Sequence, residues 1–218
     1  MTALTARPAE AAAPQAALDI RAGTTGVGLD IDLGLSRYIG ARVGYSYFRY
    51  DRTFHTTDVA YDGRLKLSMV SGLLDWYVLG GGLRVTAGAV WDGTRADVTG
   101  RPAQGRYTLS GVTYTQSEVG SLAGRLTFGH PVSPYLGIGW GNPTGAGRHV
   151  HFLVDLGVIY GGTPKDSLTA ECGPAAPPGS ALCAQLQNDV AAERHRLDSS
   201  ASLIRWYPVL DLGLAYRF

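Results

Sequence analysis

Apolar and polar residues alternate singly through much of the chain, most clearly in its C-terminal stretch from Trp206 to Phe218. One set of alternate positions there is wholly apolar and consists of Trp206, Pro208, Leu210, Leu212, Leu214, Tyr216 and Phe218. Successive side chains of a β-strand point to opposite sides, so this alternation predicts a strand with one apolar face. A tilted strand of about 9–11 residues crosses a bilayer, so the stretch is long enough to span a membrane.

The same period of two recurs through the rest of the chain. We expect strands at residues 17–24, 27–35, 39–47, 65–79, 83–92, 126–140, 150–160 and 206–218. Within the 65–79 strand the apolar residues change parity, because Leu65 and Met69 are odd-numbered whereas Val70 and Trp76 are even-numbered. One extra residue in a strand shifts its parity, so we expect a β-bulge near Met69 and Val70.

Two kinds of connection join these strands. Short turns are expected at one end of the strands, at 36–38, 80–82 and 142–147, and long loops at the other end, at about 49–63, 95–131 and 162–203. Inside the long loops we expect a strand at 107–114, a helical turn at 117–122 and a polar helix at 184–197. This asymmetry is typical of bacterial outer-membrane barrels. We therefore predict an all-β fold, an eight-stranded antiparallel up-and-down transmembrane β-barrel with short periplasmic turns and long extracellular loops.

The composition agrees with one large β domain. The chain has 218 residues, of which 30 are glycine and only 17% are charged. So much glycine disfavours a helical domain, whereas a narrow barrel needs small residues where side chains crowd inward. The net charge of +1 argues against nucleic acid as a partner, because phosphate binding is normally signalled by a basic surplus. No run reaches the roughly 18 apolar residues of a membrane helix, so a membrane-spanning form must be a closed barrel.

A short C-terminal motif carries a family resemblance. The pattern formed by Asp211, Gly213, Tyr216 and Phe218 resembles the signal by which the barrel-assembly machinery recognises outer-membrane barrels. Residues 17–218 as a whole resemble the small eight-stranded barrels, namely the transmembrane domain of outer-membrane protein A and the OmpW-like proteins. The resemblance implies a multi-pass protein of the bacterial outer membrane, in contact with outer-membrane lipid and lipopolysaccharide. This chain departs from the type in its short first strand and in lacking a separate periplasmic domain.

Residues 1–16 stand apart from the alternating pattern. They are rich in Ala and Pro and lack the basic start and apolar core of a secretory signal. The segment is either the remnant of a removed signal, with Ala11 to Ala13 near the cleavage point, or an N-terminal tail.

The direction of the faces distinguishes a membrane barrel from a soluble one. A soluble lipocalin-like barrel puts its apolar face inside and a charged face outside. Here the second face consists of small residues and a few charges, which suits a narrow interior better than a water-facing surface. We therefore expect the charged residues to pair across a plugged lumen without an open pore. The expected charges are Asp19, Arg21, Asp30, Asp32, Arg42, Arg84, Asp92, Asp155, Asp211 and Arg217, joined by Asp75 if the bulge is present.

Aromatic residues are spaced as two girdles, which such barrels carry at both membrane boundaries. We expect the outer girdle to contain Tyr45, Tyr47, Trp91, Tyr160 and Trp206. We expect the inner girdle to contain Trp76, Trp140, Tyr216 and Phe218.

The two cysteines, Cys172 and Cys183, flank a segment rich in Pro and Gly. In an oxidising compartment this spacing suits a disulfide that closes the loop. Two free thiols, or a metal pair that lacks its other ligands, are the alternatives.

The sequence offers little catalytic chemistry. Lipid A deacylases of this size use a His and a Ser two residues apart on a strand, whereas the stretch from His149 to Phe152 has two His of like parity, His149 and His151, and no Ser. Both histidines are expected at the periplasmic end, away from lipid A, and two ligands do not make a metal site. His55, His130 and His195 fall in separate loops. We therefore predict neither an enzyme nor a cofactor or metal site.

Three functions follow from this pattern. The first is a structural or adhesive barrel whose long loops bind an extracellular ligand, since binding tends to be placed on loops. The second is a narrow channel or a conduit for hydrophobic molecules of the OmpW kind. Pro208 motivates it, because a proline in a strand removes one ladder bond and could mark a lateral opening. The third and remotest is a lipid A acyl hydrolase.

Overall fold

A computed structural model of the chain describes residues 15–55, 59–102, 106–109, 111–127, 129–163, 165–201 and 205–218. Within these ranges eight strands form a closed antiparallel barrel, in which β1 pairs with both β2 and β13. The barrel strands are β1 (Gln15–Gly23), β2 (Gly26–Gly34), β3 (Ile39–His55), β4 (Val59–Tyr77), β5 (Leu83–Asp92), β10 (Val132–Trp140), β11 (Val150–Tyr160) and β13 (Trp206–Arg217). The predicted fold class is thus confirmed. Gln15 and Ala16 already belong to β1, and the rest of the N-terminal segment lies outside the described residues.

The barrel wall has the polarity expected of a protein surrounded by lipid. Leu29 is 55% exposed on the outside, whereas the adjacent Asp30 is buried in the interior. The same contrast recurs in β4, where Leu74 is 59% exposed and Asp75 is buried. Lipid offers no hydrogen bonds, so a closed barrel with an apolar outer surface satisfies its backbone within the sheet.

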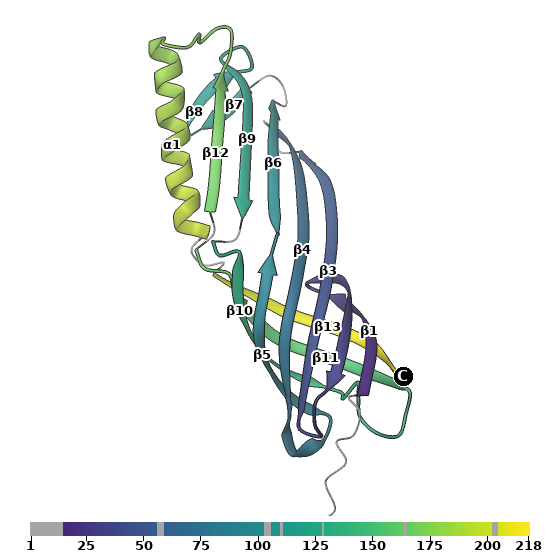
Figure 1. The fold of residues 1–218 in the computed structure, drawn as a ribbon. Coiled ribbons are helices and arrows are strands. Elements are labelled where there is room, and N and C mark those ends of the chain that lie inside the picture. The colour runs from purple at the N-terminus through teal and green to yellow at the C-terminus, as the bar shows by residue number, and fades with distance from the viewer. Residues whose placement is uncertain are drawn as a thin grey trace, which may run out of the picture.

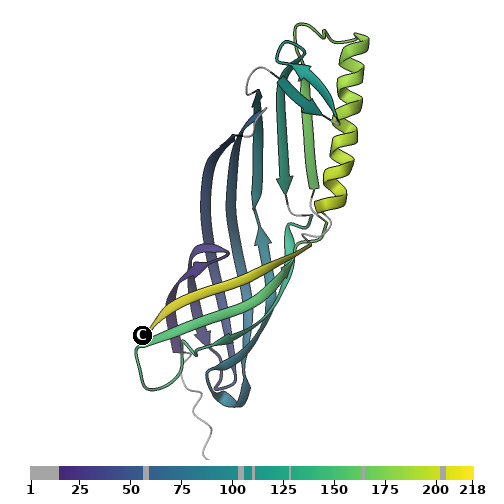
Figure 2. The same cartoon turned by 180° about the vertical axis from the view of Figure 1, so that it is seen from behind.

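The wall continues beyond the barrel as an open sheet, seen from both sides in Figures 1 and 2. The upper half of β4 pairs with β6 (Arg95–Pro102), β6 with β9 (Val119–Thr127), and β9 with β12 (Lys165–Cys172). A hairpin of β7 (Arg106–Leu109) and β8 (Val112–Thr115) stands beside this sheet. The helix α1 (Ala181–Ala201) runs along β12. We call β6 to β9, β12, α1 and the upper halves of β3 and β4 the extension.

The extension corrects the expected loops. Residues 49–63 are a continuous hairpin of β3 and β4, interrupted only where residues 56–58 are not described. The 95–131 and 162–203 segments hold five strands and a helix, and the helical turn expected at 117–122 is a turn that ends at Glu118, followed by the start of β9. The expected polar helix at 184–197 lies within α1.

The polarity of the wall inverts where β3 leaves the membrane. Because of this inversion, the sequence pattern did not predict the β3–β4 hairpin over residues 49–63. Up to Tyr47, the apolar side chains of β3 point outward and the small or polar ones inward. From Phe48 onward the order is reversed, since Phe48 and Tyr50 share the inward face of Arg42, and Arg49 points outward. Alternation therefore persists in β3, but it changes sign where water replaces lipid outside.

The same inversion explains the parity change in β4, where the expected bulge is wrong. The β3–β4 and β4–β5 ladders keep one register through Met69 and Val70. Val70 faces the lipid, whereas Leu67 and Met69 are buried on the inward face. Asp75 reaches the lumen in this unbroken register, without the extra residue that we expected.

A small core holds α1 to the sheet. Its buried members are Tyr114, Val119, Leu122, Ala170, Leu186 and Val190. Among the described helices, none is long and apolar enough to cross a membrane.

Candidate functional site

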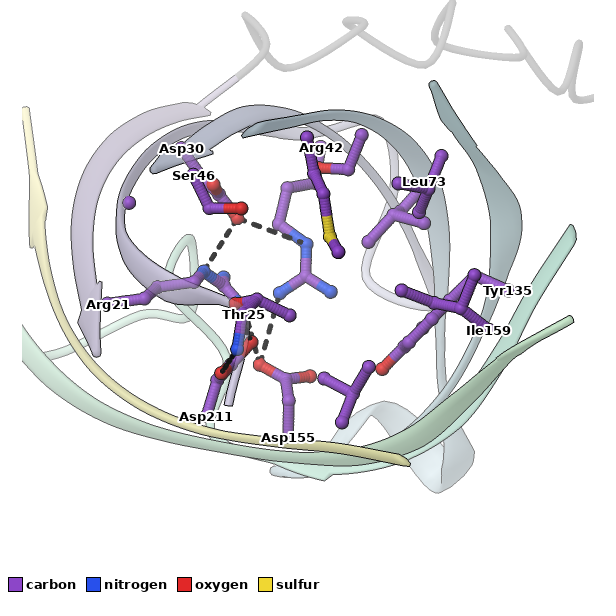
Figure 3. A pocket seen from close by; sticks show the side chains of 15 residues that line it. Arg21, Thr25, Asp30, Arg42, Ser46, Leu73, Tyr135, Asp155, Ile159 and Asp211 are labelled. Atoms are coloured by element: carbon purple, nitrogen blue, oxygen red, sulfur yellow. Dashed lines mark hydrogen bonds and ion pairs between the residues drawn. The ribbon is translucent and has the colours of Figure 1, made fainter. Parts of the chain in front are cut away.

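The barrel interior is closed by charged side chains centred on Asp155 of β11. Its carboxylate Oδ2 lies 2.5 Å from Arg21 Nη1, 3.3 Å from Arg42 Nη1 and 2.8 Å from Arg84 Nη2. The three guanidiniums come from β1, β3 and β5, so one acid links β11 to three strands with which it forms no ladder. Figure 3 shows Arg21 and Arg42 converging on Asp155.

A second layer of acids surrounds the same guanidiniums. Asp30 Oδ2 lies 2.6 Å from Arg21 Nε, and Asp19 contacts Arg21 as well. Asp75 Oδ1 lies 3.6 Å from Arg42 Nη2 and 3.4 Å from Arg84 Nε. Each guanidinium therefore has more than one carboxylate partner, which suits charges that lie out of water.

Glycine makes room for these side chains on the neighbouring strands. A Cβ at Gly44 would collide with the Asp30 carboxylate across the ladder. A Cβ at Gly139 would lie 2.8 Å from Arg84 Nε and 2.9 Å from Asp155 Oδ1. An eight-stranded barrel has an interior just wide enough for side chains, so small residues beside the large ones allow the interior to fill.

The structure brings together most of the expected lumen charges, but not all of them. The buried ion-pair network, as we name it, consists of Asp19, Arg21, Asp30, Arg42, Asp75, Arg84 and Asp155. Asp32 is buried on the same face without a described ion pair.

Besides Asp32, three further expected members lie outside the ion-pair network. Asp211 accepts a hydrogen bond from Thr25 Oγ1 at 2.8 Å. Asp92 accepts one from the backbone N–H of Thr94 at 2.7 Å. Arg217 donates to the carbonyl of Gly145 at 2.7 Å, at the end of the barrel that carries the short turns. Strand parity placed these side chains inward, but only the stagger between strands decides which charges meet at one level.

One half of the lumen is apolar, which the sequence interpretation missed. The buried cluster consists of Met69, Leu73, Val90, Tyr135, Ile159 and Val209. It lies opposite the ion-pair network across a cavity of about 50 Å³. The odd parity of Leu65 and Met69 was the signal for it, because an apolar residue in phase with lumen residues points inward when no bulge intervenes.

Most of the aromatic side chains expected in the two girdles are exposed on the outer surface of the barrel. Tyr160 and Trp206 pack with ring centroids 4.8 Å apart, beside the point where β11 and β13 meet the extension. The exposed members are Tyr45, Tyr47, Trp76, Trp91, Trp140, Trp206, Tyr216 and Phe218.

The C-terminal motif lies entirely on β13 and the residue that follows it. Gly213 pairs with Arg21 of β1 and with Leu153 of β11, in the middle of the closing strand. The backbone N–H of Phe218 donates to the carbonyl of Ala16 at 3.1 Å, so the last residue is tied to β1.

Pro208 lies where β13 extends past the end of β1. Its carbonyl accepts a hydrogen bond from Thr24 Oγ1 at 3.1 Å, and Thr24 also exchanges backbone and side-chain bonds with Leu210. The nitrogen and carbonyl of a strand residue lie on the same side, so the missing N–H faces the gap beyond β1. Pro208 therefore costs the β11 ladder no bond, contrary to our expectation. Thr24 bridges the place where we expected a lateral opening.

Cys172 and Cys183 form a disulfide with a Cα–Cα distance of 5.7 Å. It joins the end of β12 to the first turn of α1. The covalent link therefore fastens the helix to the sheet at the tip of the extension.

A buried tyrosine adds a second link between α1 and the sheet. Tyr114 Oη donates to Asp189 Oδ2 at 2.5 Å. Burial, together with this hydrogen bond to a carboxylate, raises the pKa of Tyr114 to about 12. The hydroxyl therefore stays protonated as a donor across the neutral range.

The two histidines weighed for catalysis lie on the rim that carries the short turns. His149 Nδ1 lies 3.2 Å from the carbonyl of Arg217, and His151 Nε2 lies 2.9 Å from that of Arg148. Of the other three, His130 is exposed, and the side chains of His55 and His195 are not described.

Comparisons with known proteins rest on the fold. No protein-family model matches the chain, and no curated protein matches it. The crystal structure of CarO2 from Acinetobacter baumannii matches with a TM-score of 0.58 and 20% identity, over 94% of this chain and 98% of that one. CarO from the same organism matches with a TM-score of 0.58 and 18% identity, over 96% and 100%. A major outer membrane protein from Thermus thermophilus matches with a TM-score of 0.45 and 14% identity, over 94% and 100%. With its closed barrel and apolar exterior, the chain has the fold of a small eight-stranded outer-membrane β-barrel.

Proposed function

We propose that the protein is a plugged barrel of the bacterial outer membrane that holds its extension at the cell surface, where the extension binds a partner. The observation that carries this proposal is the ion-pair network. Arg42 and Arg84 are at most 1% exposed, and both reach through the lumen to the Asp155 carboxylate. A conducting path would have to separate these pairs, and uncovering a buried charge costs about 3–5 kcal/mol when its partner is removed.

The extension supports the binding half of the proposal. It is a folded unit with its own buried core, a disulfide and a helix, whereas a simple turn would be enough to connect two barrel strands. Its outward sheet face is polar and laced with ion pairs, for example between Arg125 and Asp97 at 2.6 Å. Binding residues are disproportionately found on segments that a rigid scaffold positions, and the barrel supplies that scaffold.

The first test separates anchor from channel. Refolded full-length protein in planar bilayers should show no stepwise conductance, because the lumen is filled. Steady single-channel steps from the wild-type protein would contradict the plugged barrel.

The second test concerns the extension. A variant that joins residues 48 to 67, 92 to 132 and 160 to 206 by short turns retains the barrel strands at membrane level. We expect it to keep the heat-modifiable gel mobility of a folded barrel and to lose the adhesion of expressing cells to immobilised matrix protein and to host cells. Equal adhesion with and without the extension would refute the binding role.

A conduit for hydrophobic molecules is the second candidate, and the apolar half of the lumen favours it. Phe48 and Tyr50 are exposed on the same inward face that continues down to the buried Leu67 and Met69. An apolar solute could therefore follow this face from the extension into the barrel. Uptake of a hydrophobic dye into proteoliposomes tests it, and equal uptake by empty liposomes would end it.

Enzymatic activity is not part of the proposal. Expression of the protein should leave the acyl chains of lipid A unchanged by mass spectrometry. Loss of an acyl chain from lipid A would contradict the proposed anchoring function and support the acyl hydrolase instead.

A further inference from the structure

A row of basic side chains crosses the outward face of the wall at the base of the extension. Arg49 of β3 pairs with Lys66 of β4, and Lys66 pairs with Arg95 of β6. Arg95 pairs with Thr127 of β9, which in turn pairs with Lys165 of β12. Residues directly opposite each other on neighbouring strands share a face. We call these five residues the basic row.

The basic row lies just above the aromatic girdle. Arg49 follows Tyr47 by two residues on β3, which corresponds to a rise of about 7 Å along a strand. Lys66 Nζ lies 5.9 Å from the centre of the Tyr47 ring. Aromatic girdles mark the boundary between hydrocarbon and water. The row therefore lies at the level of the lipid head groups.

The row differs in charge from the next row above it. That row alternates in sign, and its neighbours pair directly, with Arg64 Nε 2.9 Å from Asp51 Oδ1 and Arg125 Nε 2.6 Å from Asp97 Oδ1. The basic row contains no carboxylate, and Lys66 and Lys165 form no ion pair with a described carboxylate.

Like charges placed directly across a ladder are destabilising. Arg49, Lys66 and Arg95 occupy consecutive strands, which lie about 4.8 Å apart. Part of this repulsion is relieved by Asp51, whose Oδ2 lies 2.8 Å from Arg49 Nε, and by Asp97, whose Oδ2 lies 4.0 Å from Arg95 Nε. The remaining positive charge of the basic row would be stabilised by anions from outside the chain that lie at the level of the lipid head groups.

We propose that the basic row binds the phosphate groups of outer-leaflet lipid A. Arginine presents a planar fork that matches phosphate oxygens, and lysine binds them as a point charge. Three cations at strand spacing can reach the phosphates of one head group, while its acyl chains lie along the apolar wall below Tyr47. This inference rests on the orientation in the proposed function, which places the extension outside the cell.

The test uses purified protein in detergent and compares two double variants. Lys66→Gln/Arg95→Gln removes two cations from the basic row. Arg37→Gln/Arg148→Gln removes two exposed cations from the opposite rim, where the Arg37 guanidinium lies 4.6 Å above the Tyr38 ring. Lipid A with both phosphates, lipid A with one phosphate and inorganic phosphate serve as probes. Native mass spectrometry measures binding, and heat-modifiable mobility verifies that each variant folds.

Each Lys or Arg near an anionic membrane surface strengthens binding about fivefold, so the first variant should bind lipid A about 30-fold more weakly. The control variant should bind within about twofold of wild type. Binding of wild type should weaken on loss of one phosphate and with rising salt, because exposed charges are screened. Equal losses in the two variants, or inorganic phosphate displacing lipid A at equal concentration, would overturn the proposal. Neither result depends on adhesion or conductance, so this inference can fail while the proposed function stands.

Discussion

Replacing Asp155 by Asn tests whether the ion-pair network holds the barrel closed. The carboxylate contacts three guanidiniums from three strands, so its loss deprives all three of the acid that they share. Removing one partner of a buried ion pair costs about 3–5 kcal/mol. Asp30 and Asp75 still accept from the same guanidiniums, so we expect the lower end, a loss of about 3 kcal/mol in the free energy of unfolding.

Asp211 provides a matched control. It lies directly opposite Asp155 in the β11–β13 ladder and also faces the lumen. Its described hydrogen bonds come from Thr25, and the amide oxygen of Asn can still accept the shorter of the two, from Thr25 Oγ1 at 2.8 Å. Removing one of two like charges opposite each other relieves repulsion. We therefore expect Asp211→Asn to change the free energy of unfolding by less than about 0.5 kcal/mol, or to stabilise the barrel.

Urea unfolding in lipid vesicles, followed by tryptophan fluorescence, measures both variants on one scale. If Asp155→Asn does not refold, Asp155→Glu retains the charge and should refold, whereas a purely steric role would allow the isosteric Asn and block the longer Glu. A loss below about 1 kcal/mol for Asp155→Asn, or equal losses for Asp155→Asn and Asp211→Asn, would refute the reasoning.

Three further predictions concern the wall and the extension. Leu74→Arg places a charge on the lipid face and should lower the free energy of unfolding in urea titrations by about 2–4 kcal/mol. Lys66→Leu lies on the same face of β4 but above the membrane boundary, and it should change the free energy of unfolding by less than about 0.5 kcal/mol. Replacing both cysteines by Ser should destabilise the extension by about 3 kcal/mol, measured by limited proteolysis, with barrel gel mobility unchanged. Because the pKa of Tyr114 is raised in the folded state, its protonated hydroxyl stabilises the folded extension below pH about 10, and this stabilisation is lost between pH about 10 and about 12. Circular dichroism should therefore show a partial loss of structure over this pH range that is absent in Tyr114→Phe.

The inverted polarity of β3 and β4 bears on reading other chains of this kind. Leu67 and Val70 are both apolar, yet one is buried in the barrel and the other faces lipid. A change of parity within a long strand can therefore mark the membrane boundary as well as a bulge. The two are distinguished by the charges beyond the change, because Lys66 and Arg64 continue the outward face of Val70. A true bulge would have moved those charges to the inward side.

The sequence by itself determined the number of barrel strands and the direction of their side chains at membrane level. Leu29 and Asp30 face opposite ways because a strand has a period of two, which is a local property of the backbone. The strand β13 and its C-terminal motif could be recognised in the sequence for the same reason.

Only the tertiary structure decided which inward charges meet and where the wall continues. Arg21 and Asp155 are 134 residues apart, and their contact depends on the tilt and stagger of the closed barrel. The same parity brings Asp92 and Arg217 inward at other levels, where they find different partners. The extension was hidden because pairing of β6, β9 and β12 is set by distant segments, whereas the alternation of single strands is set by neighbours in sequence.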